Sequence, residues 1–440
     1  MNQEMKNLCK WVINNTEKNG ANQCKASIVT TRDVNIRYRE EKPEIIKEAT
    51  TQGLSLEVYV DGKYSAQNTP DLRKKSLGNF IIKAIGNTRY LEEDSYRYLP
   101  DAKYYEGRSE IDLQIMDPVY QEFSAEQRHG LVRDIEKACI EKGGNKLISA
   151  QAEISDRFTE IYTLSNNGFE GEASGTRFGA EVSVTIQDEG DRKPEGFIYV
   201  SSRMLDDFPD PEKIADLVTR DAYQQLGSKK IKTEKLQVII QNRNTARILS
   251  GLLSAMNGQN LQQKSSFLLD KKDQIIGNKQ FMLIDNPLII RGLGSRLFDS
   301  DGFPCKQRTM IDEGILREYY INWYYSRKLD CEPTTGGSSN LIIPPGNRSV
   351  EEIMKDLGRG ILITGIIGGN SNSTTGDFSL GIFGQLFDHG NIIQPVAEMN
   401  IADNHLLFWN KLTEIANDPW KFSSWQLPSL VFKDIVVSGA

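Results

Sequence analysis

Histidine and cysteine are scarce in this sequence of 440 residues, and none of them forms a familiar metal-binding motif. A catalytic zinc ion needs three protein ligands held together, whereas the three histidines are scattered, so we expect each to be a surface or helix-capping residue. The cysteines include no C-x-x-C pair, which favours reduced thiols over disulfides or a structural zinc site. The histidines are His129, His389 and His405, and the cysteines are Cys9, Cys24, Cys139, Cys305 and Cys331.

Long apolar runs and an excess of basic residues are also missing. No stretch approaches the ~18 apolar residues that span a bilayer, and the N-terminal MNQEMKNLCKWVINN lacks the pattern of a signal peptide. We therefore expect a cytoplasmic chain without membrane contact. The formal net charge is −7, from 53 Lys and Arg against 60 Asp and Glu. That sign argues against direct nucleic-acid binding, which needs a basic surface to displace counterions.

Familiar catalytic and ligand-binding motifs are absent as well. The sequence contains neither a G-x-S-x-G nucleophile elbow nor a G-x-x-x-x-G-K-[ST] phosphate loop. Ser338, Ser339 and Ser379 lie among glycines, but no histidine nearby in the sequence is an obvious base for them. Residues 299–302, Asp-Ser-Asp-Gly, begin like a calcium loop, but the later ligands are missing, so we expect a hairpin turn.

The distribution of apolar residues predicts an α+β protein, with N-terminal mixed helix and antiparallel-strand domains followed by a strand-rich C-terminal domain. Alternating apolar residues precede turn signals at Asp61–Gly62 and Asn167–Gly168, which favours long hairpins. We place domains at residues 1–108, 109–230 and 231–440. Helices are expected at 3–19, 70–85, 125–142, 211–226, 350–357 and 404–416, and strands at 147–165, 168–188, 196–201 and 429–437.

A buried strand at 236–240 runs directly into a helix. Leu249, Leu252, Leu253 and Met256 recur at the spacing of a core-facing stripe. Hydrolases often present metal ligands at such a junction, yet residues 241–269 contain no His, Cys, Asp or Glu. We therefore expect this helix to pack the core and to carry no chemistry. Arg243 and Arg247 near its start could reach a partner's carboxylate, but solvated surface arginines are expected.

Two glycine-rich stretches, at 364–370 and 375–381, lie in or beside apolar strands. Glycine inside a strand lets another backbone approach closely. One interpretation is a peptide laid along a sheet edge and held by main-chain hydrogen bonds; the other is tight packing between strands. Under the first interpretation, the contact residues would be Gly365, Gly368, Gly369, Gly376 and Ser379.

Three segments resemble the TldD/PmbA family, whose bacterial members are labelled modulators of DNA gyrase or parts of a cytosolic metalloprotease. The segments are SSFLLD (265–270), FDSDGFPCKQRTMIDEGILREYYINWYYSRKLD (298–330) and SNSTTGDFSLGIFGQLFDHGNIIQPVAEMNIADN (371–404). The last is closest to the PmbA branch, also called TldE. For the TldD kind of subunit, the resemblance implies an H-E-x-x-x-H helix and a C-terminal Cys ligand that hold zinc.

In this sequence those ligands are missing. Ile-Leu-Ser-Gly-Leu-Leu-Ser (248–254) fills the place of the metal-binding helix, and no cysteine follows Cys331. We name Arg247, Ser250, Gly251 and Ser254 the degenerate metal-site residues, since they occupy that helix without an imidazole, thiolate or carboxylate. The chain itself is expected to hold no zinc.

The resemblance implies a non-catalytic subunit that pairs with a zinc-bearing TldD-like chain, or with a second copy of itself. The substrates would be unfolded peptides, such as precursors of peptide antibiotics or small antitoxins. Two alternatives stay open. The chain could be a self-standing hydrolase with an unrecognised site, or a protein that modulates gyrase by interaction.

Overall fold

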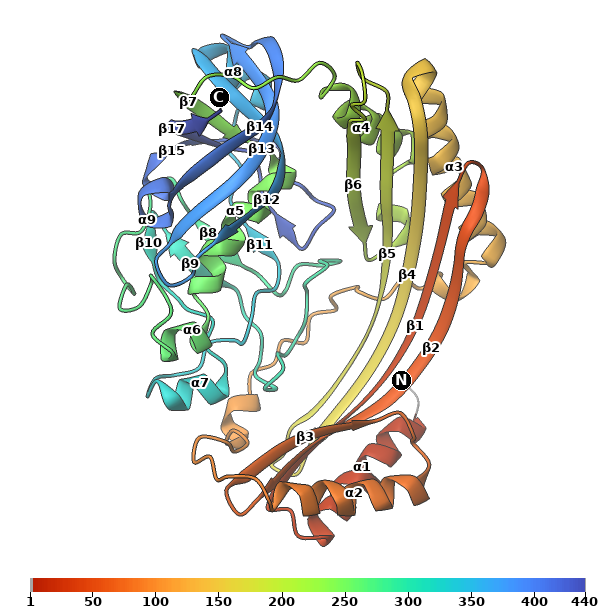
Figure 1. Cartoon of the computed structure of the whole chain (residues 1–440). Helices are drawn as coiled ribbons and strands as arrows, with labels where there is room; N and C mark the ends of the chain where they lie inside the picture. Colours follow the sequence, from red (N-terminus) through yellow and green to blue (C-terminus); the bar gives the residue numbers. More distant parts are fainter. Residues whose placement is uncertain (1–2, 440) are drawn as a thin grey trace.

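The computed structural model describes residues 3–439, and its N-terminal half is built on one long antiparallel sheet (Figure 1). The strand order is β3-β2-β1-β4-β5-β6. The sheet therefore has β3 and β6 at its edges and the longest strands in its middle. The strands are β1 (Gln23–Arg39), β2 (Lys42–Val60), β3 (Lys63–Thr69), β4 (Leu147–Ser165), β5 (Glu170–Ile186) and β6 (Glu195–Ser202).

Four helices cover one face of this sheet, and the C-terminal half of the chain lies toward the other face (Figure 1). Alternation in the strands explains this arrangement, because every second side chain is buried against the helices. The opposite face carries mostly small and charged side chains, together with the rings of Phe197 and Tyr199 on β6. The helices are α1 (Gln3–Lys18), α2 (Lys74–Thr88), α3 (Ala125–Gly143) and α4 (Pro211–Tyr223).

The predicted α+β class is confirmed, and hairpins form at both predicted turns, between β2 and β3 at Asp61–Gly62 and between β4 and β5 at Asn167–Gly168. The long hairpin of β1 and β2 turns at residues 40–41, where no turn was predicted. The sheet also joins the first two proposed domains, since β1 pairs with β4 from residue 25 to residue 39. The boundaries at 108/109 and 230/231 stay predictions. Among residues 3–439, no helix combines the length and the apolar character needed to cross a lipid bilayer.

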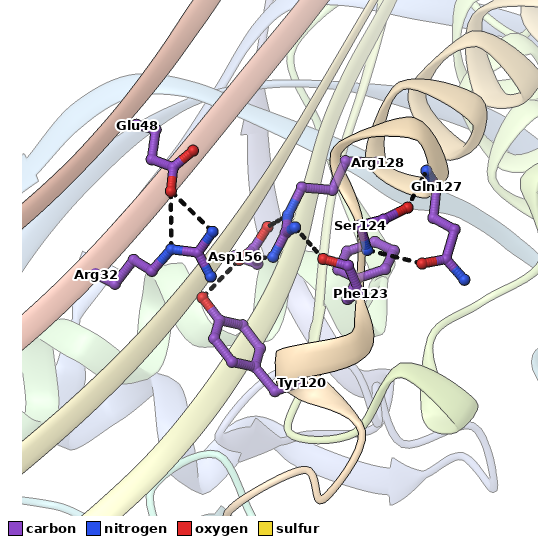
Figure 2. Close-up of polar contacts among 8 residues, drawn as sticks. All are labelled: Arg32, Glu48, Tyr120, Phe123, Ser124, Gln127, Arg128 and Asp156. Carbon is purple, nitrogen blue, oxygen red and sulfur yellow. Dashed lines mark hydrogen bonds and ion pairs between the residues drawn. The ribbon is translucent and has the colours of Figure 1, made fainter.

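A buried charge network ties α3 to the sheet (Figure 2). The Arg128 guanidinium donates to both carboxylate oxygens of Asp156 on β4, at 2.6 and 2.9 Å, and the Tyr120 hydroxyl donates to the same carboxylate at 2.7 Å. Both charged side chains are almost fully buried. At the start of α3, the N-cap Ser124 and the third helical residue Gln127 form a capping box that satisfies backbone amides there.

The C-terminal half holds two further sheets with a common apolar core between them. Their strand orders are β14-β13-β12-β7-β17-β15 and β10-β9-β8-β11-β16. The strands are β7 (Glu234–Ile240), β8 (Leu283–Asp285), β9 (Arg308–Asp312), β10 (Ile315–Leu316), β11 (Leu341–Ile342), β12 (Arg359–Ser371), β13 (Asp377–Asp388), β14 (Asn391–Asn404), β15 (Leu412–Ile415), β16 (Trp425–Gln426) and β17 (Leu430–Ser438); the helices are α5 (Asn242–Ala255), α6 (Gly258–Gln262), α7 (Trp323–Lys328), α8 (Val350–Asp356) and α9 (His405–Phe408).

Two predicted helices were wrong in extent. The helix expected at 404–416 is only the single turn α9, followed by a short 3-10 turn and strand β15. Tertiary pairing overrides helix propensity here, because Leu412 aligns with Phe432 of β17 and both are fully buried. The helix expected from residue 70 begins only at Lys74, since the Asp71 carboxylate accepts from the Arg73 amide and holds a turn there.

Candidate functional site

The strand-to-helix junction forms as predicted, with β7 leading directly into α5. The Asn242 amide donates to Ser429 Oγ at 2.9 Å, which fixes the first turn of α5 against the loop before β17. Leu249, Leu252 and Met256 are fully buried, so the core-facing stripe is confirmed. Leu253, the other residue assigned to that stripe, is only half-buried.

The degenerate metal-site residues lie on the polar side of α5, next to strand β12. Ser250 Oγ donates to the Arg247 carbonyl of its own helix at 2.8 Å, and Ser254 is exposed. Arg247 is exposed as expected, but its Nη2 donates to the Gly369 carbonyl at 3.0 Å. That bond brings the degenerate helix and the glycine-rich strand together in one site.

His405 completes this site, and sequence reasoning missed it. It was expected at the surface or as a cap, but only 1% of it is exposed. Its ring stacks on Phe267 at 5.5 Å, and its Nε2 lies 2.9 Å from Ser371 Oγ at the end of β12. A Cβ built on Gly251 would lie 2.5 Å from His405 Nε2, so α5 and the histidine are in direct contact. His405 precedes an apolar run, Leu-Leu-Phe-Trp, which was the available signal of burial.

The pairing of Ser371 with His405 looks like a nucleophile and base, but its hydrogen bonds oppose that role. Trp409 Nε1, which can only donate, donates to His405 Nδ1 at 3.2 Å. In the neutral ring the proton must therefore be on Nε2, which donates to Ser371 and cannot accept its proton. Burial lowers the pKa of His405 to about 4, against the weaker opposite effect of Asp403, and keeps the ring neutral.

The other two histidines do not join the site. His129, on α3, is half-buried and its Nδ1 lies 3.1 Å from the Tyr38 hydroxyl. His389 is exposed and pairs with the adjacent Asp388. Among residues 3–439, no three His, Cys, Asp or Glu side chains gather where they could hold a metal ion. The absence of zinc from this chain stays a prediction.

The glycine-rich stretch at 364–370 lies in β12, along an edge that has no strand partner among the described residues. β12 pairs with β7 only over residues 360–363 but continues to Ser371. Beyond that pairing, Asn244 and Arg247 of α5 donate to the carbonyls of Thr364 and Gly369, each at 3.0 Å. Gly368 and Gly369 have φ of 68° and 89°, where other residues are strained.

The remaining proposed contact residues make contacts within the chain. The absence of a side chain at Gly365 leaves room for the Phe383 ring, and Gly376 packs against Phe267 and Asn404. Ser379 exchanges a hydrogen bond with Asn400 on the neighbouring strand β14, at 3.1 Å. Tight strand packing therefore explains these three residues, and their contact with a peptide stays a prediction.

A cleft of about 630 Å³ adjoins the unpaired edge of β12 and separates it from β6. The cleft has apolar walls on both sides, since Phe197 and Tyr199 of β6 and Ile367 of β12 are 53%, 43% and 54% exposed. Trp420, Phe422 and Trp425 lie at the cleft as well. Sequence reasoning did not find it, because its two walls come from segments about 170 residues apart.

An ion pair joins the two halves of the chain at this cleft. Arg243 of α5 binds Asp221 of α4 with two hydrogen bonds of 2.7 Å, and both side chains are mostly buried. The expectation that Arg243 is a solvated surface residue was therefore wrong. The bidentate pair fixes the start of α5 relative to the N-terminal half.

Comparison with known proteins gives the family. The model of the PmbA/TldA metallopeptidase central domain matches residues 119–226, and that of the C-terminal domain matches residues 233–439. The metalloprotease PmbA homologue of Buchnera aphidicola (strain APS) is 28% identical, over 94% of this chain and 92% of its own length. The metalloprotease PmbA of Escherichia coli O157:H7 is 24% identical, over 94% and 91%.

Solved structures agree over the whole fold. A protein of Bacteroides thetaiotaomicron named as a modulator of DNA gyrase is 34% identical, with a TM-score of 0.96 and full coverage of both chains. TldE of Thermococcus kodakarensis, at 18% identity, shares the fold with a TM-score of 0.86, over 99% of this chain and 100% of its own. On this sequence and structural agreement, the chain belongs to the PmbA/TldD family, in its PmbA/TldE branch.

Proposed function

We propose that this chain is a non-catalytic subunit of a cytosolic two-chain metalloprotease, in which a TldD-like partner carries the zinc. The observation that supports the proposal is the composition of α5, whose site-facing positions are Arg247, Ser250, Gly251 and Ser254. None of them is a zinc ligand or a general base for metal-bound water. The contact of Gly251 with His405 also leaves no room for a longer side chain there.

In this role the chain binds and orients substrate while the partner cleaves it. The unpaired edge of β12 offers main-chain hydrogen bonds to an extended peptide, and the cleft offers apolar walls to its side chains. Unfolded peptides fit such a site, because their main chain is free to pair with a strand. Peptide-antibiotic precursors and small antitoxins are substrates of this kind.

Reconstitution tests the proposal. The purified chain, a TldD-like chain from the same cell, and their mixture are each incubated with an unfolded reporter peptide. We expect cleavage only when the partner is present, stronger cleavage by the mixture than by the partner alone, and loss of all cleavage with a chelator. Cleavage by this chain alone in excess chelator would instead indicate an independent hydrolase.

Metal analysis and affinity purification provide a second test. After incubation with zinc and desalting, we expect less than about 0.1 zinc per chain, because α5 lacks every usual ligand type. A tagged chain purified from its native cell should recover a TldD-like chain. One bound zinc per chain, or recovery of gyrase in place of a TldD-like chain, would contradict the proposal.

A further inference from the structure

A group of arginines lies on the face of the N-terminal sheet that is turned toward the C-terminal half. Arg157 of β4 and Arg177 of β5 are directly opposite each other across the ladder. Like charges in that position repel each other and destabilise the pair. Arg157 is compensated by an ion pair with Asp33 of β1. Among residues 3–439, Arg177 forms no ion pair with a carboxylate, and its Nη2 donates to Ser201 Oγ at 3.3 Å.

A third guanidinium increases the positive charge next to Arg177. Arg203, just after β6, donates to the carbonyls of Thr176, Gly292 and Leu293 at 3.0, 3.3 and 2.7 Å. In the part of the chain that the structure describes, it forms no ion pair with a carboxylate. Burial, together with the positive charge of Arg177, lowers the pKa of Arg203 to about 10. Within residues 3–439, neither of these two neighbouring cations is therefore paired with a carboxylate.

Arg177 itself is exposed on this face of the sheet. Its neighbours on the same face of β5 are Gly175 and Gly179, two residues away on either side, and neither has a side chain. The residues opposite these glycines on β4 are Thr159 and Ser155, which are small. A Cβ built on Gly175 would lie 3.3 Å from Arg203 Nη1, and one built on Gly179 would lie 3.3 Å from the Tyr199 hydroxyl. Arg177 therefore lies between the second guanidinium and an aromatic residue of the cleft.

Arg177 is linked to the cleft through Ser201. The Ser201 hydroxyl lies 3.4 Å from the carbonyl of Phe422, and its amide donates to the same carbonyl at 3.1 Å. Phe422 lines the cleft, as does Tyr199, which is two residues before Ser201 on the same face of β6. One ligand could therefore place apolar side chains in the cleft and an acidic group at Arg177. A nucleic acid does not fit this arrangement, since the chain as a whole is acidic.

We propose that Arg177, supported by Arg203, binds a carboxylate of the peptide whose apolar side chains occupy the cleft. The inference rests on the proposed function only in taking the ligand to be a peptide. A guanidinium binds a carboxylate through two parallel hydrogen bonds, which gives both affinity and orientation. The carboxylate can come from the C-terminus of the peptide or from an Asp or Glu side chain.

Binding of labelled peptides to the purified chain tests this inference without the partner or its zinc. Three fluorescein-labelled octapeptides share an apolar core. One has a free C-terminal carboxylate, one a C-terminal amide, and one an amide plus an Asp next to the C-terminus. Fluorescence anisotropy should show about tenfold tighter binding of at least one acidic peptide than of the neutral one. The acidic peptide that gains affinity identifies the source of the carboxylate.

Variants then locate the effect. Arg177→Gln should remove the preference for the acidic peptide without lowering the affinity for the neutral peptide. Arg177→Lys should keep part of the preference. Arg133→Gln is the matched control, because Arg133 is exposed on α3, on the opposite side of the sheet. Thermal melting checks that each variant is folded. An unchanged preference in a folded Arg177→Gln variant, equal binding of all three peptides, or no binding of any would overturn the inference. Each of these results leaves the reconstitution test of the partner unaffected.

Discussion

At the residue scale, Gly251 sets the distance between α5 and the end of β12. A methyl group on this residue would lie 2.4 Å from Ser371 Oγ and 2.5 Å from His405 Nε2, closer than atoms can approach. Helix α5 is therefore packed against the histidine by backbone contact. The composition of the sequence could predict that α5 has no metal ligands, but it could not predict this contact, because residues 251, 371 and 405 are joined only by the fold.

Replacement of Gly251 by Ala should destabilise the protein by about 1–3 kcal/mol, because overpacking outweighs the gain of about 1 kcal/mol in helix propensity. Urea denaturation measures the change. Gly78→Ala is the matched control, since Gly78 lies in α2 and has no atom within 4 Å of the added methyl group. The control should be as stable as the wild type or more so. Equal effects of the two substitutions would contradict the packing at Gly251.

His405 should make the stability of the protein depend on pH. Burial lowers its pKa from 6.5 to about 4, so the unfolded chain takes up a proton more readily than the folded one. The stability that results is fully present above pH 6.5 and is lost as the pH falls toward 4, by about 3 kcal/mol in total. Denaturation of the wild type and of His405→Asn, each at several pH values, isolates the contribution of His405 to the pH dependence of stability. Parallel pH profiles would show that His405 does not contribute.

At the scale of elements, the buried ion pair between Arg128 and Asp156 holds α3 on the sheet (Figure 2). Asp156→Asn should lower the free energy of unfolding by about 3–5 kcal/mol, because it leaves the charge of Arg128 buried without a partner. Glu48→Gln is the control. It breaks the exposed pair with Arg32 and should cost less than about 1 kcal/mol. Guanidinium denaturation compares the two, and similar losses would mean that Arg128 reaches water.

Periodicity predicted the long strands and most helices of this chain, because each has one apolar face that must be buried. It failed at residues 404–416, where apolar residues at helical spacing form one turn and then a strand. Leu412 is buried in either structure, so burial alone could not decide between them. The partner strand β17 lies about 20 residues further along the chain, and local sequence carries no information about that pairing.

At the scale of the whole molecule, the sheet of the N-terminal half joins segments that the family models separate. The central-domain model begins at residue 119, yet β4 forms its ladder with β1, which lies before that point. A fragment of residues 119–440 should therefore expose the whole edge of β4 and associate with itself. Size-exclusion chromatography should show aggregates for this fragment under conditions where the full chain elutes normally. A folded, monodisperse fragment would contradict the importance of that pairing.

The cleft belongs to the same scale, since its walls come from segments far apart in the chain. Residue types alone showed that α5 contains no His, Cys, Asp or Glu. It could not place Phe197 and Tyr199 opposite Ile367, because nothing in either stretch indicates the other. The residue types of α5 could be read from the sequence, whereas the pairing of the two cleft walls could not.

The position of β6 at the edge of its sheet has an evolutionary consequence. Phe197 and Tyr199 point away from the core that α4 covers, so mutations there leave no cavity behind. Under the proposed function, relatives can exchange these two aromatic rings and bind different peptides, while the fold around α5 stays the same. Sequence differences within the branch should therefore be most frequent on β6. Exchanging β6 between relatives should change which peptides the proposed site binds.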